Sequence, residues 1–354
     1  MKTSALLALL IGLFTASWTA VNGPGTRSLD PAKSAAAVAP SAQDAKQEAL
    51  AAAEREDDEA AGGWHKSPDN PVLGGNLGTC FDVALLREGP TYRMWFSWRP
   101  RKAIALVEGT DGVHWSDPVI TLAPNPATGW EDDVNRPVVV KRPDGYQMWY
   151  TGQSRGHSWI GHATSPDGIK WSRTTTKPVL SADARWEKVA VMCPHVLWDD
   201  ESKRYRLWYS GGDQYEPDAI GYATSPDGVS WTKHPGNPIF RADPGRAWER
   251  HKVTACQVVR HGDWYEMFYI GFRDGDHAQI GLARSKDGVS GWERHPANPI
   301  LRPGAGKWDA DAVYKPFALP GDGRWRLWYN GRRGGVEQIG MAVHDGDDLG
   351  FPKP

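Results

Sequence analysis

The chain has 354 residues, among them 39 glycines, 27 prolines and 19 tryptophans. This mixture of turn formers and aromatic residues favours many short strands joined by tight turns over layers of long helices. The formal charge of −2 gives no electrostatic basis for binding nucleic acid or an anionic membrane, so neither is expected as a partner.

The first 62 residues are expected to lie outside the folded domain. Residues 1–20 combine a positive start at Lys2 with a short apolar stretch from Leu6 to Phe14 and small residues after it, which is typical of a cleaved export signal. Residues 21–62 are rich in Ala, Ser, Pro and acidic residues and are expected to form a disordered linker. We therefore expect a secreted or periplasmic protein without a membrane span, whose folded domain covers residues 63–354.

One aromatic-rich segment recurs through the rest of the chain, at residues 92–96, 146–150, 205–209, 265–269 and 325–329. An apolar stretch precedes each copy. After most copies come a strand of small residues, an Asp-Gly turn and a segment that begins with Trp. Four strands per unit and five units predict an all-β fold, a five-bladed β-propeller with four-stranded antiparallel blades.

The two ends of the repeat predict how the ring closes. The fifth unit stops after Asp345-Gly346, without the segment that begins with Trp. Residues 64–73 match that missing segment, because they resemble residues 231–240 and 292–301. The N-terminal strand is therefore expected to complete the last blade, which removes an exposed sheet edge.

Charge is distributed unevenly between the two sets of loops. The Ser-Pro-Asp-Gly type of turn repeats from unit to unit, whereas the loops that precede the innermost strands and those that join second and third strands carry different charged residues in each unit. Ligands are expected in the concave mouth where the variable loops meet. The binding candidates there are Asp132, His195, Tyr215, Glu216, His251, Arg273, His277, Asp311 and Arg332.

Segments such as Met148–Gly152 and Leu207–Gly211 carry a family resemblance. Over about residues 64–346 the chain resembles the five-bladed propeller glycosidases, namely glycoside hydrolase families 32, 43, 62, 68, 117 and 130. The resemblance implies a hydrolase that cleaves an extracellular oligosaccharide or polysaccharide with carboxylates placed around the axis. One carboxyl group would protonate the leaving oxygen while another assists attack at the sugar carbon.

The resemblance assigns some catalytic roles and leaves one open. Asp82 resembles the base or nucleophile, and Asp133 the carboxylate that tunes it. However, Arg136 stands where a family 43 enzyme carries Asp, and Met192 stands where family 32 carries the acidic Glu. The general acid must then come from elsewhere, and the candidates are Glu187, Glu249, Glu216 and His251.

Glu187 and Glu249 also have a structural interpretation, because each follows Trp at an equivalent position and repetition favours a hydrogen-bonding role within the loop. No cofactor is expected. The three cysteines form neither a disulfide framework nor a metal-binding spacing, and a structural Ca²⁺ near the axis, as in some family 43 relatives, is the open alternative.

Two other functions compete with hydrolysis. Because Met192 stands in place of an acidic residue, a second hypothesis is a non-catalytic carbohydrate-binding propeller, which would bind sugar without turnover. A family-130-like phosphorylase, in which Lys252, Arg273, Arg332 and Arg333 receive phosphate, ranks third. The oligomeric state is left open.

Overall fold

The part of the chain that the structure describes is built from strands. The computed structural model describes residues 59–215 and 217–353, which contain twenty strands, four three-residue 3₁₀ helices and no α-helix. The prediction of an all-β fold is confirmed. None of these short helices is long and apolar enough to cross a membrane. The expected export signal, and the expected linker as far as residue 58, lie outside the described residues.

The strands fall into groups of four, numbered here in chain order. Group one contains β2 (Cys80–Glu88), β3 (Thr91–Trp98), β4 (Ala103–Gly109) and β5 (Val119–Leu122). Group two contains β6 (Asp133–Arg142), β7 (Gly145–Ser154), β8 (His157–Ser165) and β9 (Ser172–Arg173). Group three contains β10 (Ala190–Asp199), β11 (Arg204–Gly212), β12 (Pro217–Ser225) and β13 (Thr232–Lys233).

Group four contains β14 (Lys252–His261), β15 (Trp264–Phe272), β16 (Ala278–Ser285) and β17 (Glu293–Arg294). Group five contains β18 (Ala312–Gly321), β19 (Arg324–Arg333), β20 (Val336–Asp345) and β1 (Trp64–Lys66). The 3₁₀ helices are Gly75–Leu77, Arg99–Arg101, Pro126–Thr128 and Arg185–Glu187.

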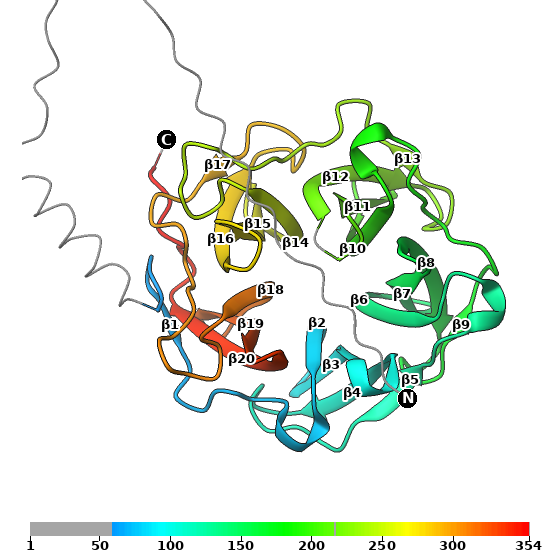
Figure 1. Ribbon diagram of the computed structural model, residues 1–354, viewed down its shortest axis with the longest axis horizontal. Helices are drawn as coiled ribbons and strands as arrows, with labels where there is room; N and C mark the ends of the chain where they lie inside the picture. Colours follow the sequence, from blue (N-terminus) through cyan, green and yellow to red (C-terminus); the bar gives the residue numbers. More distant parts are fainter. Residues whose placement is uncertain (1–58, 216, 354) are drawn as a thin grey trace, which may run out of the picture. The chain divides into compact units, whose positions relative to one another are not determined.

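The first strand of each group lies nearest the centre of the fold, and Figure 1 shows β2, β6, β10, β14 and β18 arranged around it. Each of these inner strands contacts the next, and β18 contacts β2, so the contacts run in a closed cycle. Groups one, four and five are separate antiparallel sheets. Groups two and three differ from the expected separate blades, because one parallel pair, Ala190 with Ser158, joins them into an eight-stranded sheet.

The N-terminal strand pairs with the last sheet. In β1, Trp64 lies opposite His344 and Lys66 opposite Ala342 of β20, and the Trp64 side chain is buried. The preceding residues also contact the fold, since the Ala61 amide donates to the Ile300 carbonyl at 3.0 Å. The last group is therefore completed by a segment far away in the sequence, as the repeat comparison predicted.

A repeated tryptophan links one group to the next. The indole nitrogen at the centre of the second strand donates to a glycine carbonyl in the Asp-Gly turn of a neighbouring group. These bonds join Trp95 to Gly168, Trp149 to Gly228, Trp208 to Gly288 and Trp328 to Gly112, at 2.7–2.9 Å. Phe268 occupies the equivalent position in group four and has no such donor. The junction between groups four and five therefore lacks this bond.

Each inner strand also bulges at one residue with a positive φ angle, and we call these five positions the axial ring. Pairing with the second strand shifts register at each of them. The ring residues and their φ angles are Asp82 at 52°, Arg136 at 54°, Cys193 at 53°, Ala255 at 36° and Lys315 at 54°.

Side chains of the preceding group hold the backbone of this ring. Amide donors in the ring bond to polar side chains at one repeated position of the second strand. The pairs are Asp82 with Asn330, Arg136 with Ser97, Cys193 with Thr151 and Ala255 with Ser210, at 2.7–3.1 Å. Lys315 is in group five, and the equivalent position in the preceding group four is Ile270, whose side chain cannot accept a hydrogen bond. The junction between groups four and five thus lacks both repeated bonds.

The Ser210→Ala variant tests this arrangement. It leaves the buried amide of Ala255 without an acceptor, so we expect the free energy of unfolding to fall by about 1–3 kcal/mol in denaturant titrations. Ser181→Ala, at an exposed serine, serves as the control and should unfold like the wild type. Equal stability of the two variants would contradict a stabilising role for the Ser210 hydrogen bond.

Candidate functional site

Three charged side chains meet in the axial ring. The Asp82 side chain is 4% exposed, with Arg136 Nε 3.5 Å from Oδ2 and Lys315 Nζ 3.7 Å from Oδ1. Within the described part of the chain neither carboxylate oxygen accepts a hydrogen bond. Because a buried carboxylate without hydrogen bonds is costly, the two cations are what compensate its charge.

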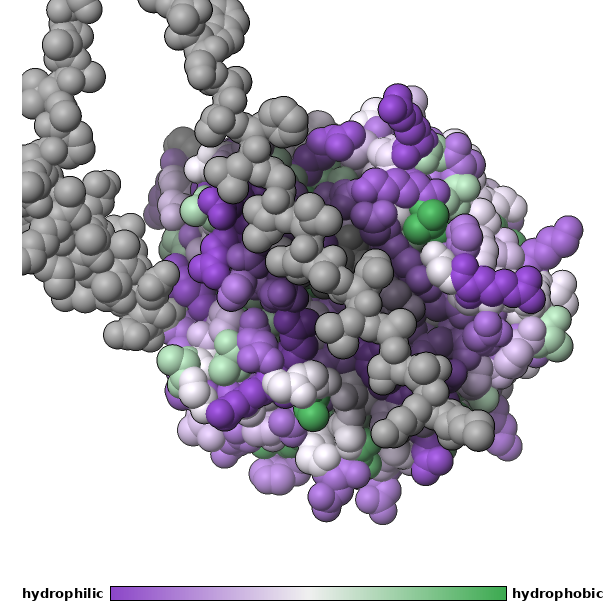
Figure 2. Space-filling model, viewed as in Figure 1, coloured by the Kyte–Doolittle hydropathy of each residue, from purple (hydrophilic) through white to green (hydrophobic). Residues whose placement is uncertain are grey.

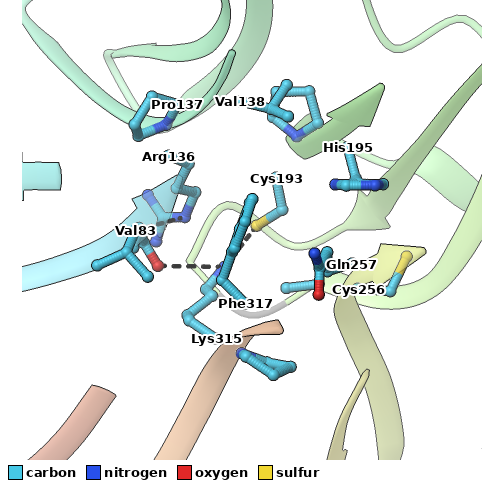
Figure 3. A pocket seen from close by; sticks show the side chains of 14 residues that line it. Val83, Arg136, Pro137, Val138, Cys193, His195, Cys256, Gln257, Lys315 and Phe317 are labelled. Carbon is cyan, nitrogen blue, oxygen red and sulfur yellow. Dashed lines mark hydrogen bonds and ion pairs between the residues drawn. The ribbon is translucent and has the colours of Figure 1, made fainter. Parts of the chain in front are cut away.

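The two cations have further partners in the ring and beside it. Lys315 Nζ donates to the Cys193 thiol at 2.6 Å, and these side chains lie together in Figure 3. Arg136 Nη1 donates to Asn135 Oδ1 at 2.6 Å and, more weakly, to Gln153 Oε1 at 3.4 Å. Both cations are therefore held in place by neighbouring side chains as well as by Asp82.

A small cavity of about 40 Å³ adjoins the ring, and Val138, His195, Gln257 and Phe317 are among the residues around it (Figure 3). It has room for only a few water molecules. His195 Nε2 lies 2.7 Å from the Val258 carbonyl, and burial lowers the pKa of His195 to about 4. His195 is therefore neutral near pH 7 and bonds to the neighbouring inner strand.

A larger cavity of about 260 Å³ shares Arg136 and Lys315 with the small one, so these two side chains form its floor and separate it from Asp82. Residues of all five groups line it, most of them from groups four and five. One wall is apolar and is formed by Ile270, Phe272, Ala278 and Ala312. The rest is polar, and includes Arg99, Gln153, Tyr215, Asp276, Arg332 and Glu337.

Glu337 is a buried carboxylate that lines this cavity. Arg99 donates to it through Nη2 at 2.8 Å and Nε at 3.2 Å, and the Tyr314 hydroxyl donates to its other oxygen. Burial and the adjacent Glu337 carboxylate raise the pKa of Tyr314, which therefore remains a proton donor at neutral pH. Glu337 is thus held by an arginine on one oxygen and a tyrosine on the other.

Three of the expected site residues lie at these cavities besides His195. Asp82 is in the axial ring, and Tyr215 and Arg332 line the larger cavity. Tyr215 is 68% exposed, so it stands at the rim. Arg332 Nη2 donates to the backbone carbonyl of Asp276 at 3.1 Å, which links two loops of the mouth.

Asp132 and Asp133 lie near the ring without lining either cavity. Asp133 accepts a hydrogen bond from Asn135 Nδ2 at 2.8 Å, and Asn135 in turn binds Arg136. Asp132 accepts one from the Ser154 hydroxyl at 2.6 Å. Asp133 is therefore connected to the ring through Asn135, and its charge also helps to raise the pKa of Arg136.

Glu187 and Glu249 belong to a buried motif that repeats in four groups, and neither lines the two cavities. In this motif a carboxylate after Trp binds a tyrosine of the second strand and a cation of the outermost strand. The carboxylate–tyrosine–cation sets are Glu131–Tyr150–Arg173, Glu187–Tyr209–Lys233, Glu249–Tyr269–Arg294 and Asp309–Tyr329–Lys66. All four carboxylates are fully buried, which favours their structural interpretation.

The remaining expected residues sit in the loops and line neither cavity. Arg273 and His277 both pair with Asp274, at 3.2 and 2.7 Å. Asp311 accepts from the Gly334 amide at 2.7 Å, and His251 is exposed. Glu216 lies outside the described residues. In the described ranges no group of three or more His, Cys, Asp or Glu side chains is arranged to hold a metal ion.

Sequence reasoning overlooked Lys315, Tyr314 and Glu337 as a connected set and treated Arg136 only as a departure from a family pattern. One signal could have found two of them. Arg136, Cys193 and Lys315 each immediately precede a proline of an inner strand, and the residue at this position differs in every repeat. A position that varies while its surroundings repeat is a candidate functional position.

The chain has low sequence identity to several known proteins. No protein-family model matches the chain. It is 27% identical over 277 residues to Uncharacterized protein Rv1502 of Mycobacterium tuberculosis, a match that covers 72% of this chain and 89% of that protein. It is 24% identical over 212 residues to Beta-fructofuranosidase 1 of Zea mays, covering 55% of this chain and 30% of the maize enzyme.

Solved structures of glycosidases share the fold. One, described as a glycoside hydrolase, has a TM-score of 0.66 at 18% identity and covers 87% of this chain and 99% of its own. Another belongs to the GH130 family of mannoside phosphorylases and is described with hydrolases that target beta-1,2 mannosidic linkages. It has a TM-score of 0.64 at 16% identity, covering 84% of this chain and 98% of its own. The expected resemblance to the propeller glycosidase superfamily is therefore confirmed at the level of the fold.

The Glu187→Gln variant separates structure from catalysis. Loss of the charge weakens the bonds that Glu187 accepts and leaves Lys233 with Asp183 and the Ser181 carbonyl as its remaining partners, so the free energy of unfolding should fall by about 1–3 kcal/mol. Turnover per folded molecule should change little, because Glu187 lies away from both cavities. Glu249→Gln is the matched variant and should behave alike. A large loss of turnover with unchanged stability would identify Glu187 as the acid instead.

His195 gives a prediction about pH. Its pKa is about 4 in the folded protein against an ordinary value of 6.5, so the unfolded chain takes up a proton first as pH falls. The stability that His195 contributes is therefore complete above pH 6.5 and decreases from there toward pH 4. We expect His195→Gln to flatten this pH dependence in denaturant titrations. An imidazole that titrates near pH 6.5 in NMR spectra of the folded protein would contradict the assignment.

Proposed function

We propose that this protein is an exported glycosidase, built as a five-bladed propeller, that holds one sugar unit in the larger cavity and cleaves its glycosidic bond. The observation that carries the proposal is Asp82, a buried axial carboxylate whose oxygens accept no hydrogen bond from the described residues. The closed cycle of inner strands supports the blade count, and residues 1–20 support export.

The walls of the larger cavity suit a sugar. Its apolar side, with Ile270 and Phe272, offers a surface for the carbon-bound hydrogens of a sugar ring. Its polar side offers arginine, amide and carboxylate groups to the hydroxyls. Figure 2 shows a mostly hydrophilic surface with small separate apolar patches where it is not covered in grey, which gives no support to a broad protein-binding surface on that face.

Glycosidic cleavage requires two carboxyl groups, and Asp82 and Glu337 are the pair that we assign to it. Asp82, compensated by two cations, is suited to act as the base or nucleophile. Glu337 is assigned the role of the acid. Both of its oxygens accept hydrogen bonds, from Arg99 and from the Tyr314 hydroxyl, so it has to take up a proton from solvent and release Arg99 before it can protonate the leaving oxygen. Because Arg136 and Lys315 cover Asp82, the substrate has to move at least one of these side chains to reach it.

The test is a product assay on plant, algal and microbial glycans with wild type, Asp82→Asn and Glu337→Gln. General acid–base groups contribute about a hundredfold to ten-thousandfold, so each variant should lose at least about a hundredfold in rate. Asp322→Asn, an exposed carboxylate, is the control and should keep the wild-type rate. Parallel reactions with added phosphate separate hydrolysis from phosphorolysis, the activity for which the mannoside phosphorylases of the GH130 family are named.

A non-catalytic sugar-binding protein is the second candidate, favoured by one observation. Met192, which stands where family 32 carries its acid, is fully buried beside the ring and contributes no carboxylate. This candidate predicts that a glycan raises the melting temperature while no product forms with or without phosphate. That result would replace the enzyme proposal with the binding one.

A further inference from the structure

The larger cavity carries more positive than negative charge. The side chains that line it include the cations Arg99, Arg136, Lys315 and Arg332, and the carboxylates Asp276 and Glu337. Glu337 compensates Arg99 through their hydrogen bonds. Asp82, behind the floor, is the carboxylate that lies within 4 Å of both Arg136 and Lys315. At this distance the floor has two cations for one carboxylate, and Asp133 and Glu337 act on Arg136 from farther away.

The two floor cations have donors to offer. Arg136 uses Nη1 for Asn135 and Gln153, whereas its buried Nε, 3.5 Å from Asp82 Oδ2, has no hydrogen-bond acceptor in the described residues, so the guanidinium can turn toward an anion without losing a hydrogen bond at Nε. Lys315 donates to the Cys193 thiol, a weak acceptor, and lies 3.7 Å from Asp82 Oδ1, beyond hydrogen-bond length. An anionic group in the cavity would find strong donors here, because charge-assisted hydrogen bonds strengthen in buried surroundings.

We infer that the ligand of this cavity is an acidic sugar unit, a uronic acid, whose carboxylate binds Arg136 and Lys315. The choice of a sugar rests on the proposed function, whereas the choice of an anion rests on the charges of the floor. Inorganic phosphate would share the anionic chemistry, but it would leave the apolar wall of Ile270 and Phe272 uncovered. A uronic acid places its ring on that wall and its carboxylate on the floor.

This placement explains how a covered Asp82 becomes accessible. A ligand carboxylate competes with Asp82 for the two cations, which are long side chains that can turn toward the cavity. As Lys315 and Arg136 move toward the ligand, they move away from Asp82. A neutral sugar has no charge with which to draw them. The acidic group of the substrate is therefore both a recognition element and the means of uncovering the reactive carboxylate.

Calorimetric titration of the full chain tests the inference with matched ligands. The probes are oligomers of galacturonic acid or glucuronic acid, the same oligomers with methyl-esterified carboxyls, and inorganic phosphate. We expect at least one acidic oligomer to bind about tenfold or more tightly than its ester, because the ester keeps the ring and loses the charge. Its affinity should fall as salt is added. Equal binding of acid and ester, or binding of phosphate alone, overturns the inference.

Variants locate the anion. Lys315→Met should remove most of the preference for acid over ester, whereas Lys315→Arg should retain it, since the charge is kept. Lys203→Met, at an exposed lysine paired only with Asp200, is the matched control and should bind like the wild type. Melting curves establish that each variant is folded, and Arg136→Gln, at the other floor cation, provides the same comparison if Lys315→Met does not fold. An unchanged acid preference in a folded Lys315→Met or Arg136→Gln places the anion elsewhere and overturns the inference.

The outcomes separate this inference from the proposed function. If acidic oligomers bind selectively but no product forms, the acidic ligand is supported and the proposed glycosidase activity is contradicted. If neutral glycans are cleaved in a reaction that depends on Asp82, with no preference for acid over ester, the glycosidase activity is supported and the acidic ligand is contradicted.

Discussion

Five left-handed residues at the axis are the constraint on which this site depends. For residues other than glycine this backbone conformation costs about 1–2 kcal/mol each, so the surroundings must hold it in place. Here a register shift fixes each bulge, and a polar side chain of the preceding sheet binds four of the five amides. The free energy that this backbone conformation costs is offset by hydrogen bonds from one sheet to the next rather than by bonds within a sheet. Because these bonds hold the backbone of each axial residue, its side chain is free to vary.

That freedom sets the chemistry of the centre. The ring presents one acid, two bases, a thiol and an alanine, namely Asp82, Arg136, Lys315, Cys193 and Ala255. At the axis a single carboxylate, Asp82, lies within 4 Å of two cations. A further buried carboxylate, Glu337 near the start of β20, is held by Arg99 and Tyr314. The same architecture can therefore hold a different balance of charge without a change in its strands.

Most of the fold could be predicted from the sequence because its packing repeats. The tryptophans and tyrosines that recur in register are the buried residues of each group, and the displaced Trp64 segment revealed which strand completes the last sheet. The site was harder. Tyr215 and Arg332 were predicted because their loops differ between units, and Asp82 because it resembles a catalytic residue of the propeller glycosidases; all three line one of the two cavities. Glu187 and Glu249 could not be assigned from charge alone, since a buried carboxylate that binds tyrosine and a cation looks in sequence like a catalytic one. Lys315 was overlooked because side-chain alternation does not reveal where a strand bulges.

The junction between groups four and five gives the ring one side unlike the others. Phe268 and Ile270 replace the residues that elsewhere bind the next sheet, yet Gln257 exchanges two hydrogen bonds with the Ala318 backbone, at 2.8 and 2.6 Å, beside the small cavity. This junction lacks both repeated bonds and is joined instead by Gln257 beside the small cavity and by Arg332, which donates to the Asp276 carbonyl at the mouth. The ring is therefore closed here by two long polar side chains, one at each end of the junction, whereas short side chains and indoles make the repeated bonds elsewhere.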